Sequence, residues 1–123
     1  MGMNYYVKLK DRKVNQRDLH IGKNSAGWEF SFQGYEVDEY YNIPQLKSKQ
    51  EWFEYIFLYF EDSIYNEENE NITFHKFANI VNGTKNKGLS NHYDYLKKQH
   101  DYESLKDCFK DEDGFSISMG EFE

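Results

Sequence analysis

The sequence predicts an α+β fold in which a small antiparallel sheet, made of an N-terminal hairpin and a C-terminal strand, packs against two or three helices. Hydrophobic residues alternate near both ends of the chain, which indicates strands. The middle carries helical periodicity with capping signals. No repeat, heptad run or linker interrupts the 123 residues, so we expect one domain over residues 1–123. Aromatic residues, 19% of the chain, supply the core.

The N-terminal strands follow from alternation and from turn residues. Residues 4–10 alternate between apolar and polar side chains and predict an amphipathic strand. Residues 19–21 and the alternating segment 28–32 flank residues 22–27, whose glycines and asparagine favour positive φ. This pattern predicts a β-hairpin with its reversal at residues 22–27. Residues 34–46 are expected to be irregular.

A capping box opens the first expected helix, over residues 49–64. Ser48 would accept from the backbone N–H of Glu51, and the Glu51 side chain would return to the N–H of Ser48. Apolar residues continue around most of this helix, beyond a single stripe. The helix is therefore expected to be either the buried centre of the fold or a partner surface. Residues 65–71 are expected to form an acidic, asparagine-rich loop.

The second half of the chain predicts two more helices and a strand. Thr73 is the expected N-cap of the second helix, with Ile72 and Phe77 as a hydrophobic staple and Gly83 as the left-handed residue after its end. A basic loop is expected at residues 85–88 and a short helix at 90–100. Residues 111–114 carry turn chemistry that leads into an alternating strand at 115–119.

Charge is distributed unevenly along the chain. The net charge is −7, but residues 1–23 hold six basic and two acidic residues, a net of +4, whereas the remainder carries −11. A duplex nucleic acid needs many lysine and arginine contacts to its phosphates, so direct duplex binding is not expected. An acidic body is instead attracted to basic surfaces of other proteins.

The apolar segments and the single cysteine indicate the cellular compartment in which we expect the protein. No apolar run approaches the roughly 20 residues needed to cross a bilayer, and the N-terminus lacks the apolar region of a signal peptide, so we expect no membrane partner. Cys108 is alone, which allows neither an internal disulfide nor a thiolate metal site. A small buried thiol in a reducing, cytoplasmic compartment is the expectation.

One polar cluster suggests a ligand. Glycine-rich turns expose backbone N–H groups, and a lysine adds a charge for phosphate. The chain lacks the P-loop pattern, because Arg17 and Asn24 stand where that pattern needs glycine and Ser or Thr. Lys23 would bind phosphate, Trp28 would stack on a base, and His20 would donate a hydrogen bond or act as an acid or base. The candidate ligand-binding residues are His20, Gly22, Lys23, Ser25 and Trp28.

Metal and catalytic patterns are absent from the sequence. The histidines at 20, 75, 92 and 100 show no i, i+4 pair, and the EF-hand-like residues 111–114 lack the ligands at both ends of such a loop. There is no G-x-S-x-G elbow. We therefore expect no metal, no cofactor and no catalytic residue.

The segment Leu-His-Ile-Gly-Lys-Asn-Ser-Ala-Gly-Trp-Glu-Phe-Ser at residues 19–31 resembles a family of small, uncharacterised proteins encoded by tailed bacteriophages. The resemblance continues in order through the Trp52 helix, the helix start at 72–74 and the closing residues 120–122. Members of that family often carry a Cys-x-x-Cys pair before the run and a Cys after the Trp. This chain has no Cys there and has Glu29 at the second position, so the resemblance implies no metal site here.

The resemblance and the charge together favour a phage-encoded protein-binding module that inhibits or redirects a bacterial host or defence protein, such as a CRISPR nuclease, by covering a basic surface. Tyrosines and carboxylates suit such an interface. The expected contact residues are Glu36, Asp38, Glu39, Tyr40, Tyr41, Glu67, Glu68 and Glu70. Two alternatives remain: a nucleotide- or phosphate-binding protein or enzyme that uses the cluster at His20–Lys23, and a homo-oligomeric structural or assembly protein.

Overall fold

The computed structural model describes residues 2–10, 13–85, 87 and 90–120. Seven strands form one sheet in the order β5-β4-β1-β2-β3-β7-β6. They are β1 (Gly2–Val7), β2 (Leu19–Ser25), β3 (Ser31–Gln33), β4 (Ile64–Asn66), β5 (Asn71–Ile72), β6 (Cys108–Lys110) and β7 (Ser116–Ser118). The pairing is antiparallel except between β3 and β7. The predicted α+β class is confirmed, with a larger sheet than expected.

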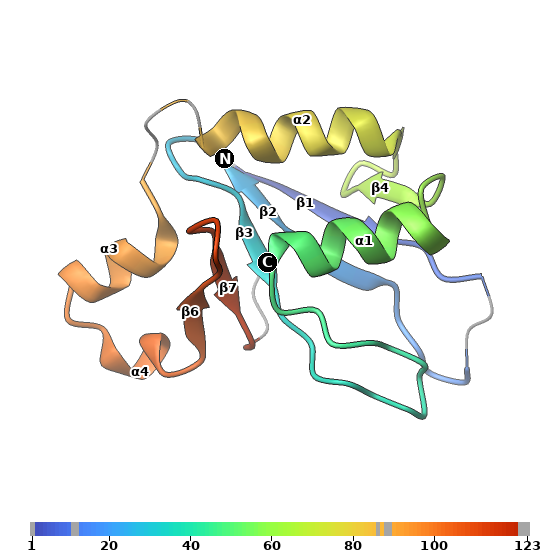
Figure 1. Cartoon of the computed structure of the whole chain (residues 1–123), viewed down its shortest axis with the longest axis horizontal. Coiled ribbons are helices and arrows are strands. Elements are labelled where there is room, and N and C mark those ends of the chain that lie inside the picture. Colours follow the sequence, from blue (N-terminus) through green and yellow to red (C-terminus); the bar gives the residue numbers. More distant parts are fainter. Residues whose placement is uncertain (1, 11–12, 86, 88–89, 121–123) are drawn as a thin grey trace.

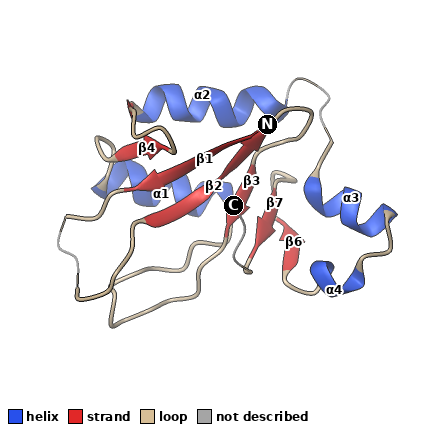
Figure 2. Cartoon of the chain, turned by 180° about the vertical axis from the view of Figure 1, so that it is seen from behind, coloured by secondary structure: helices blue, strands red, loops and turns tan. Residues whose placement is uncertain are grey.

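Four helices accompany the sheet: α1 (Lys49–Tyr59), α2 (Phe74–Lys85), α3 (His92–Lys98) and α4 (Tyr102–Leu105). The helices α1 and α2 lie on one face of the sheet, whereas α3 and α4 lie beside β6 and β7 (Figures 1 and 2). Within the part of the chain that the structure describes, no helix lies over the other face of β1 and β2 (Figure 2).

The core lies between the sheet and the α1–α2 layer. Alternate strand residues such as Val7, Ile21 and Phe32 are fully buried, as the period of two requires. Phe77 from α2 meets Phe30 edge-on, with ring centroids 5.6 Å apart. The Trp52 indole N–H donates to the carbonyl of Gln33 at 2.8 Å, which fixes α1 to β3.

The N-terminal hairpin is confirmed, but its reversal lies later than expected. β2 runs through Ser25, and Gly27, with a φ of +83°, makes the turn. Gly22 is a strand residue without positive φ. A Cβ there would collide with the backbone carbonyl of Ser31 and would lie 2.6 Å from Phe30 Cε1. Gly22 therefore permits the close approach of two strands and does not form the turn.

A β-bulge in β2 changes which side chains face the uncovered side of the sheet. Tyr5 pairs with Gly22 while Tyr6 pairs with His20, so one residue of β2, Ile21, has no partner across the ladder. The side chains of residues 20 and 23 therefore point to the same face. In a regular strand, residues three positions apart would point to opposite faces.

The contacts of Gly2 agree with this assignment. A Cβ on Gly2 would meet the Lys23 side chain and would lie 2.8 Å from Ser25 Oγ. Gly2 shares its face of β1 with Asn4, which bonds to His20. His20, Lys23 and Ser25 therefore share the uncovered face.

The first helix begins as predicted and ends earlier. Ser48 Oγ accepts from the N–H of Glu51 at 3.0 Å, but the Glu51 carboxylate accepts from the N–H of Lys47, one residue before the expected one. The helix stops at Tyr59, and the predicted extension to residue 64 is wrong because Ile64 already pairs with Val7 of β1.

The predicted loop at 65–71 is also wrong, because β4 and β5 form a hairpin there. Asn66 Oδ1 accepts from the N–H groups of Glu68 and Glu70, which closes its turn.

The second helix is capped by Thr73, whose Oγ1 accepts from the N–H of Lys76 at 3.1 Å. Gly83 lies inside α2 and does not terminate it, so that prediction is wrong. The helix continues because Thr84 is held in the core: its Oγ1 accepts from the N–H of Phe30 at 3.0 Å and donates to the carbonyl of Val81 at 2.7 Å.

Of the remaining predicted elements, some are confirmed, and the structure contains two further elements that were not predicted. The third helix is confirmed as α3, and the final strand as β7, whereas α4 and β6 were not predicted. The expected irregular course of residues 34–46 is confirmed, although the bridges of Tyr35 with Leu46 and of Asp38 with Ile43 fold it into a narrow excursion. We call residues 35–46 the excursion. Residues 86 and 88 of the expected basic loop, and the closing residues 121 and 122, lie outside the described part of the chain.

Candidate functional site

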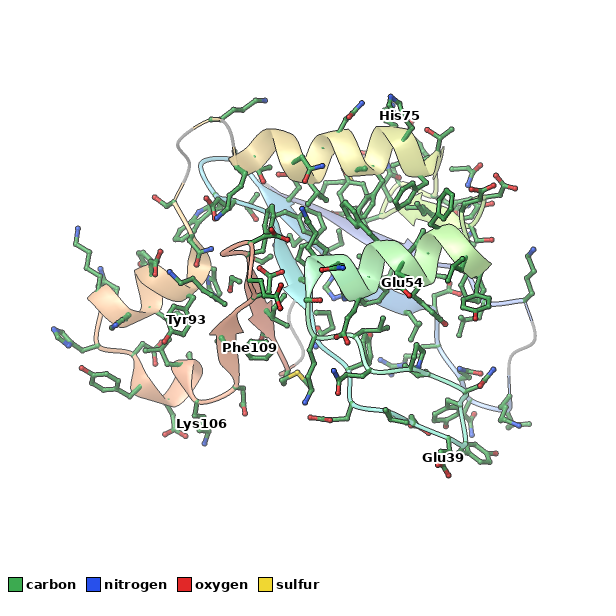
Figure 3. All side chains as sticks on the ribbon, viewed as in Figure 1. Glu39, Glu54, His75, Tyr93, Lys106 and Phe109 are labelled. Atoms are coloured by element: carbon green, nitrogen blue, oxygen red, sulfur yellow. The ribbon has the colours of Figure 1, made fainter. Side chains whose placement is uncertain are left out.

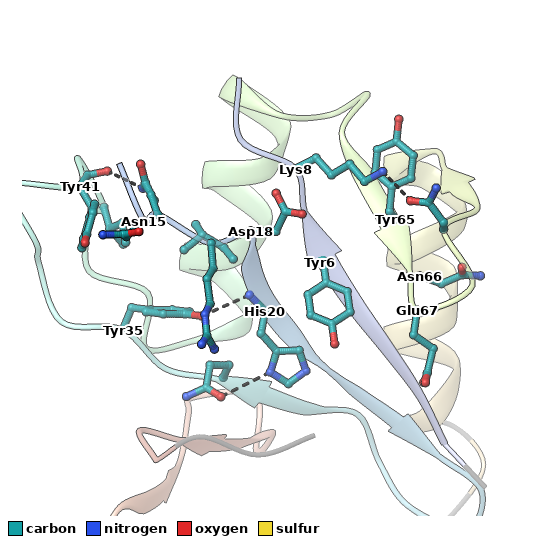
Figure 4. Close-up of a pocket in the computed structure, with 16 residues that line it drawn as sticks. Tyr6, Lys8, Asn15, Asp18, His20, Tyr35, Tyr41, Tyr65, Asn66 and Glu67 are labelled. Atoms are coloured by element: carbon teal, nitrogen blue, oxygen red, sulfur yellow. Dashed lines mark hydrogen bonds between the residues drawn. The ribbon is translucent and has the colours of Figure 1, made fainter. Parts of the chain in front are cut away.

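A hollow of about 600 Å³ lies on the uncovered face of the sheet (Figure 4). We call it the sheet-face hollow. Strands β1, β2 and β4 form its floor, and the loop before β2 and the excursion form its rim. Its lining combines four tyrosines, two cations, two carboxylates and several amides. The aromatic and charged residues are Tyr6, Tyr35, Tyr41, Tyr65, Lys8, Arg17, Asp18 and Glu67.

His20 lies on the floor of this hollow and is only 7% exposed. Its Nε2 is 2.9 Å from Asn4 Oδ1, and its Nδ1 is 3.4 Å from Gln33 Oε1. The Gln33 amide nitrogen donates to the carbonyls of Ser118 and Gly120, which turns its oxygen toward the histidine. The side-chain nitrogen of Asn4 faces a carboxylate, 3.4 Å from Glu67 Oε1.

This network positions the His20 ring. Both ring nitrogens lie within hydrogen-bond distance of amide oxygens, so either nitrogen can carry the proton and donate. These contacts hold the ring at the floor of the hollow.

The structure brings together part of the predicted ligand cluster. His20, Lys23 and Ser25 share the uncovered face, as the bulge requires. A Cβ at Gly22 would point to the core side of the sheet. Trp28 packs edge-on against Tyr95 of α3, with ring centroids 4.9 Å apart, and so does not lie beside His20. Gly22 and Trp28 therefore do not join His20, Lys23 and Ser25 on the uncovered face, and the ligand-binding role of these five residues stays a prediction.

The predicted acidic contacts fall into two separate groups. In the excursion, Glu36 pairs with Lys47 at 2.6 Å, and Asp38 accepts from the N–H of Tyr41 at 3.1 Å. Glu39 lies exposed at the tip of the excursion, beside Tyr40 (Figure 3).

The second acidic group lies in the β4–β5 hairpin. Glu67 Oε1 accepts from the backbone N–H of Asn4 at 2.7 Å, and Glu70 accepts from the side-chain nitrogen of Asn66 at 2.8 Å. Glu68 is exposed. Tyr41 and Glu67 lie on opposite sides of the sheet-face hollow, so the two groups do not form one continuous patch (Figure 4).

Sequence reasoning missed a second hollow, of about 640 Å³, between the excursion and the end of α1. We call it the α1 groove. Its lining is Leu9, Lys10, Gln16, Val37, Asp38, Glu39, Tyr41, Asn42, Ile43, Pro44, Tyr55, Tyr59 and Phe60. These residues come from four separate segments, so no local pattern marks them. The one available signal was the excess of apolar residues on the first helix.

The other histidines and the cysteine do not form a reactive centre. Among the described residues, no three metal-ligating side chains gather. Burial lowers the pKa of His92, although Asp101 acts in the opposite direction. Burial also raises the pKa of the Cys108 thiol, against a hydrogen bond with Ser118 that lowers it. A thiol with a raised pKa is a weak nucleophile at neutral pH.

Comparison with protein-family models, with curated proteins and with solved structures found no match to this chain. Across its described residues, no helix has both the length and the apolar character that a membrane span requires.

Proposed function

We propose that this chain is a protein-binding module that contacts a basic segment of a bacterial host or defence protein through the α1 groove. The observation that carries the proposal is a concave surface with exposed aromatic and apolar side chains at its edge. Tyr59 is 66% exposed, and in the neighbouring excursion Tyr40 is 63% and Val37 is 61% exposed. Clustered aromatic residues of this kind anchor protein interfaces.

The groove has the chemistry to hold an apolar anchor. Pro44, Tyr55 and Phe60 line it, so a partner side chain that enters would exchange water for apolar contacts. Burial raises the pKa of Tyr55 to about 12, so this tyrosine is neutral at physiological pH. An apolar residue of the partner therefore meets no charge at that wall of the groove.

Carboxylates beside the groove specify the charge of the partner. Asp38 and Glu39 line it together with one cation, Lys10, and Glu36 stands two residues before Asp38. Outside residues 1–23 the chain carries a net charge of −11, which steers basic surfaces toward it. The proposed contact is thus a lysine- or arginine-rich segment with one apolar side chain.

The resemblance of residues 19–31 to a tailed-phage family supports a partner inside the bacterial host cell. A phage protein that covers a basic surface would block whatever that surface normally binds, for example the nucleic acid held by a defence nuclease. Inhibition or redirection of the partner follows from that competition and needs no catalytic residue in this chain.

The test is capture from bacterial lysate with four variants as bait. Tyr59→Ala removes an aromatic wall of the groove, and Tyr102→Ala removes a tyrosine of similar exposure, 65%, from α4. Glu39→Lys and Glu103→Lys change charge equally, in the excursion and on α4. We expect a stoichiometric partner whose affinity falls at least tenfold with the two groove variants and not with the two α4 variants.

Two results would overturn the proposal. One is a partner retained equally by all four variants, because its contact surface would then lie elsewhere. The other is a dimer in light scattering at two concentrations that Tyr59→Ala dissociates, because a second copy of the chain would then occupy the groove.

A further inference from the structure

Two basic residues of the N-terminal segment line the sheet-face hollow. Lys8 leaves the end of β1 and Arg17 the loop before β2, and both line the hollow. Lys23 lies further along β2 on the same uncovered face. The hollow thus places two cations, Lys8 and Arg17, beside two carboxylates, Asp18 and Glu67, which suits a ligand that carries both an anionic group and hydroxyl groups.

Flat rings line the floor beside these cations. Tyr6 of β1 and Tyr65 of β4 are direct partners across the ladder, so their side chains stand on the same face. The Tyr6 ring lies 5.2 Å from the His20 ring. Lys8 Nζ lies 3.9 Å above the Tyr65 ring centroid and also donates to Asn69 at 2.5 Å. A planar group can therefore pack against the Tyr6 ring, and the Lys8 ammonium group lies over the ring of its ladder partner, Tyr65.

Hydrogen-bonding groups complete the lining. His20 contributes a ring whose nitrogens lie 2.9 Å from Asn4 Oδ1 and 3.4 Å from Gln33 Oε1. The carboxylates have a different role: Glu67 accepts from the N–H of Asn4 at 2.7 Å, and Asp18 from the N–H of Leu9 at 3.4 Å. As acceptors they suit sugar hydroxyls, and they disfavour phosphate at their own positions. Amides such as Asn15 on the rim can bond to the edge of a base.

We infer that the sheet-face hollow binds a nucleotide, with its base against Tyr6 and its phosphate between Lys8 and Arg17. A volume of about 600 Å³ fits one such unit and not a duplex. Aromatic stacking combined with cations is the general way in which proteins hold single nucleotides or single strands. The site is distinct from the predicted cluster, because it uses β1 and β4 and omits Gly22 and Trp28.

The experiment is titration calorimetry with the four ribonucleoside monophosphates, inorganic phosphate and an eight-nucleotide single strand. We expect at least one monophosphate to bind at least tenfold more tightly than inorganic phosphate. Lys8→Gln, Arg17→Gln and Tyr6→Leu should each weaken it at least tenfold. Lys110→Gln is the matched control, because Lys110 also lies over a tyrosine ring, 5.8 Å from the centroid of Tyr93, and also makes a polar contact.

The three kinds of probe distinguish a mononucleotide, an oligonucleotide and inorganic phosphate as the ligand. Tighter binding of the single strand, with the same loss in the three variants, would support the nucleotide site and identify an oligonucleotide as its occupant. Equal binding of phosphate and nucleotide would overturn the inference, because no base would then contact Tyr6. Absence of binding to every probe at millimolar concentration would overturn it as well, provided that thermal melting shows a folded protein.

Discussion

Gly22 shows how one residue permits a local arrangement of strands. Strands β2 and β3 approach so closely at this position that the Ser31 carbonyl occupies the space of a side chain. The glycine lies next to the unpaired Ile21, and the bulge there turns His20 and Lys23 to one side. The close strand approach at Gly22 and the bulge at Ile21 thus lie side by side in β2.

Gly22→Ala should lower the free energy of unfolding by about 1–3 kcal/mol, because a methyl group there collides with backbone. Gly83→Ala is the control, since a Cβ at that helical position meets nothing within 4 Å and alanine should stabilise α2 by about 0.5–1 kcal/mol. Urea unfolding measures both. Equal stability of the two variants would contradict the close strand approach.

His92 should make stability depend on pH. Because burial lowers its pKa in the folded state below the ordinary value of 6.5, the unfolded chain takes up a proton at higher pH than the folded one. The contribution of this group is therefore fully present above about pH 6.5 and is lost as the pH falls through the folded pKa.

Thermal melting of His92→Gln between pH 8 and pH 5 checks this expectation. The variant should lose less stability on acidification than the wild type. His75→Gln, which changes an exposed histidine on α2, should behave as the wild type does. A wild-type slope retained in His92→Gln would show that other groups cause the acid sensitivity.

At the level of the elements, the starts of α1 and α2 were predictable, whereas much of the sheet was not. Capping by Ser48 and Thr73 is local chemistry, so the starts of α1 and α2 could be identified from a few neighbouring residues. The hairpin of β4 and β5 rests on short polar strands whose partner is β1, and the parallel pairing of β3 with β7 joins residues about 85 apart. No local pattern specifies such pairings.

The candidate site was predicted only in part, because it also depends on strand pairings that no local pattern specifies. His20 and Lys23 could be selected from residue type, but the face to which each points depends on the bulge at Ile21. Tyr6 and Tyr65 become neighbours only when β4 pairs with β1. The acidic residues of the excursion were identified, whereas the groove beside them depends on how the excursion packs against α1.

An ion pair between buried Glu29 and half-buried Lys85 joins several elements at the other end of the sheet. Glu29 accepts from Lys85 Nζ at 3.0 Å and from the Asn91 side-chain nitrogen at 3.0 Å. Asn91 also caps α3 and donates to the Gly114 carbonyl. Glu29 thus connects the end of α2, the start of α3 and the turn before β7.

Glu29→Ala should cost about 2–4 kcal/mol of stability, because it leaves Lys85 and Asn91 without their shared acceptor. Glu103→Ala removes the exposed ion pair with Lys106 and should cost less than about 1 kcal/mol. Denaturant unfolding compares the two. If both variants lose the same small amount, the pair at Glu29 does not hold these elements together.

At the scale of the whole molecule, two hollows of different chemistry lie close together. The sheet-face hollow is lined by tyrosines, two cations and two carboxylates, and the α1 groove is lined by apolar and aromatic side chains with Asp38, Glu39 and Lys10. Gln16, Tyr41 and Ile43 line both hollows, so the wall between them is a single layer of residues. An acidic chain can in this way attract a basic protein at one hollow and an anionic ligand at its neighbour.

The claim that the α1 groove is the protein-binding surface is tested most directly by hydrogen exchange of the chain alone and in complex with its captured partner. We expect amides of residues 35–46 and of residues 55–60 to exchange more slowly in the complex, while α3 and α4 keep their rates. Protection confined to α3 and α4, with unchanged exchange at the excursion and the end of α1, would contradict the assignment.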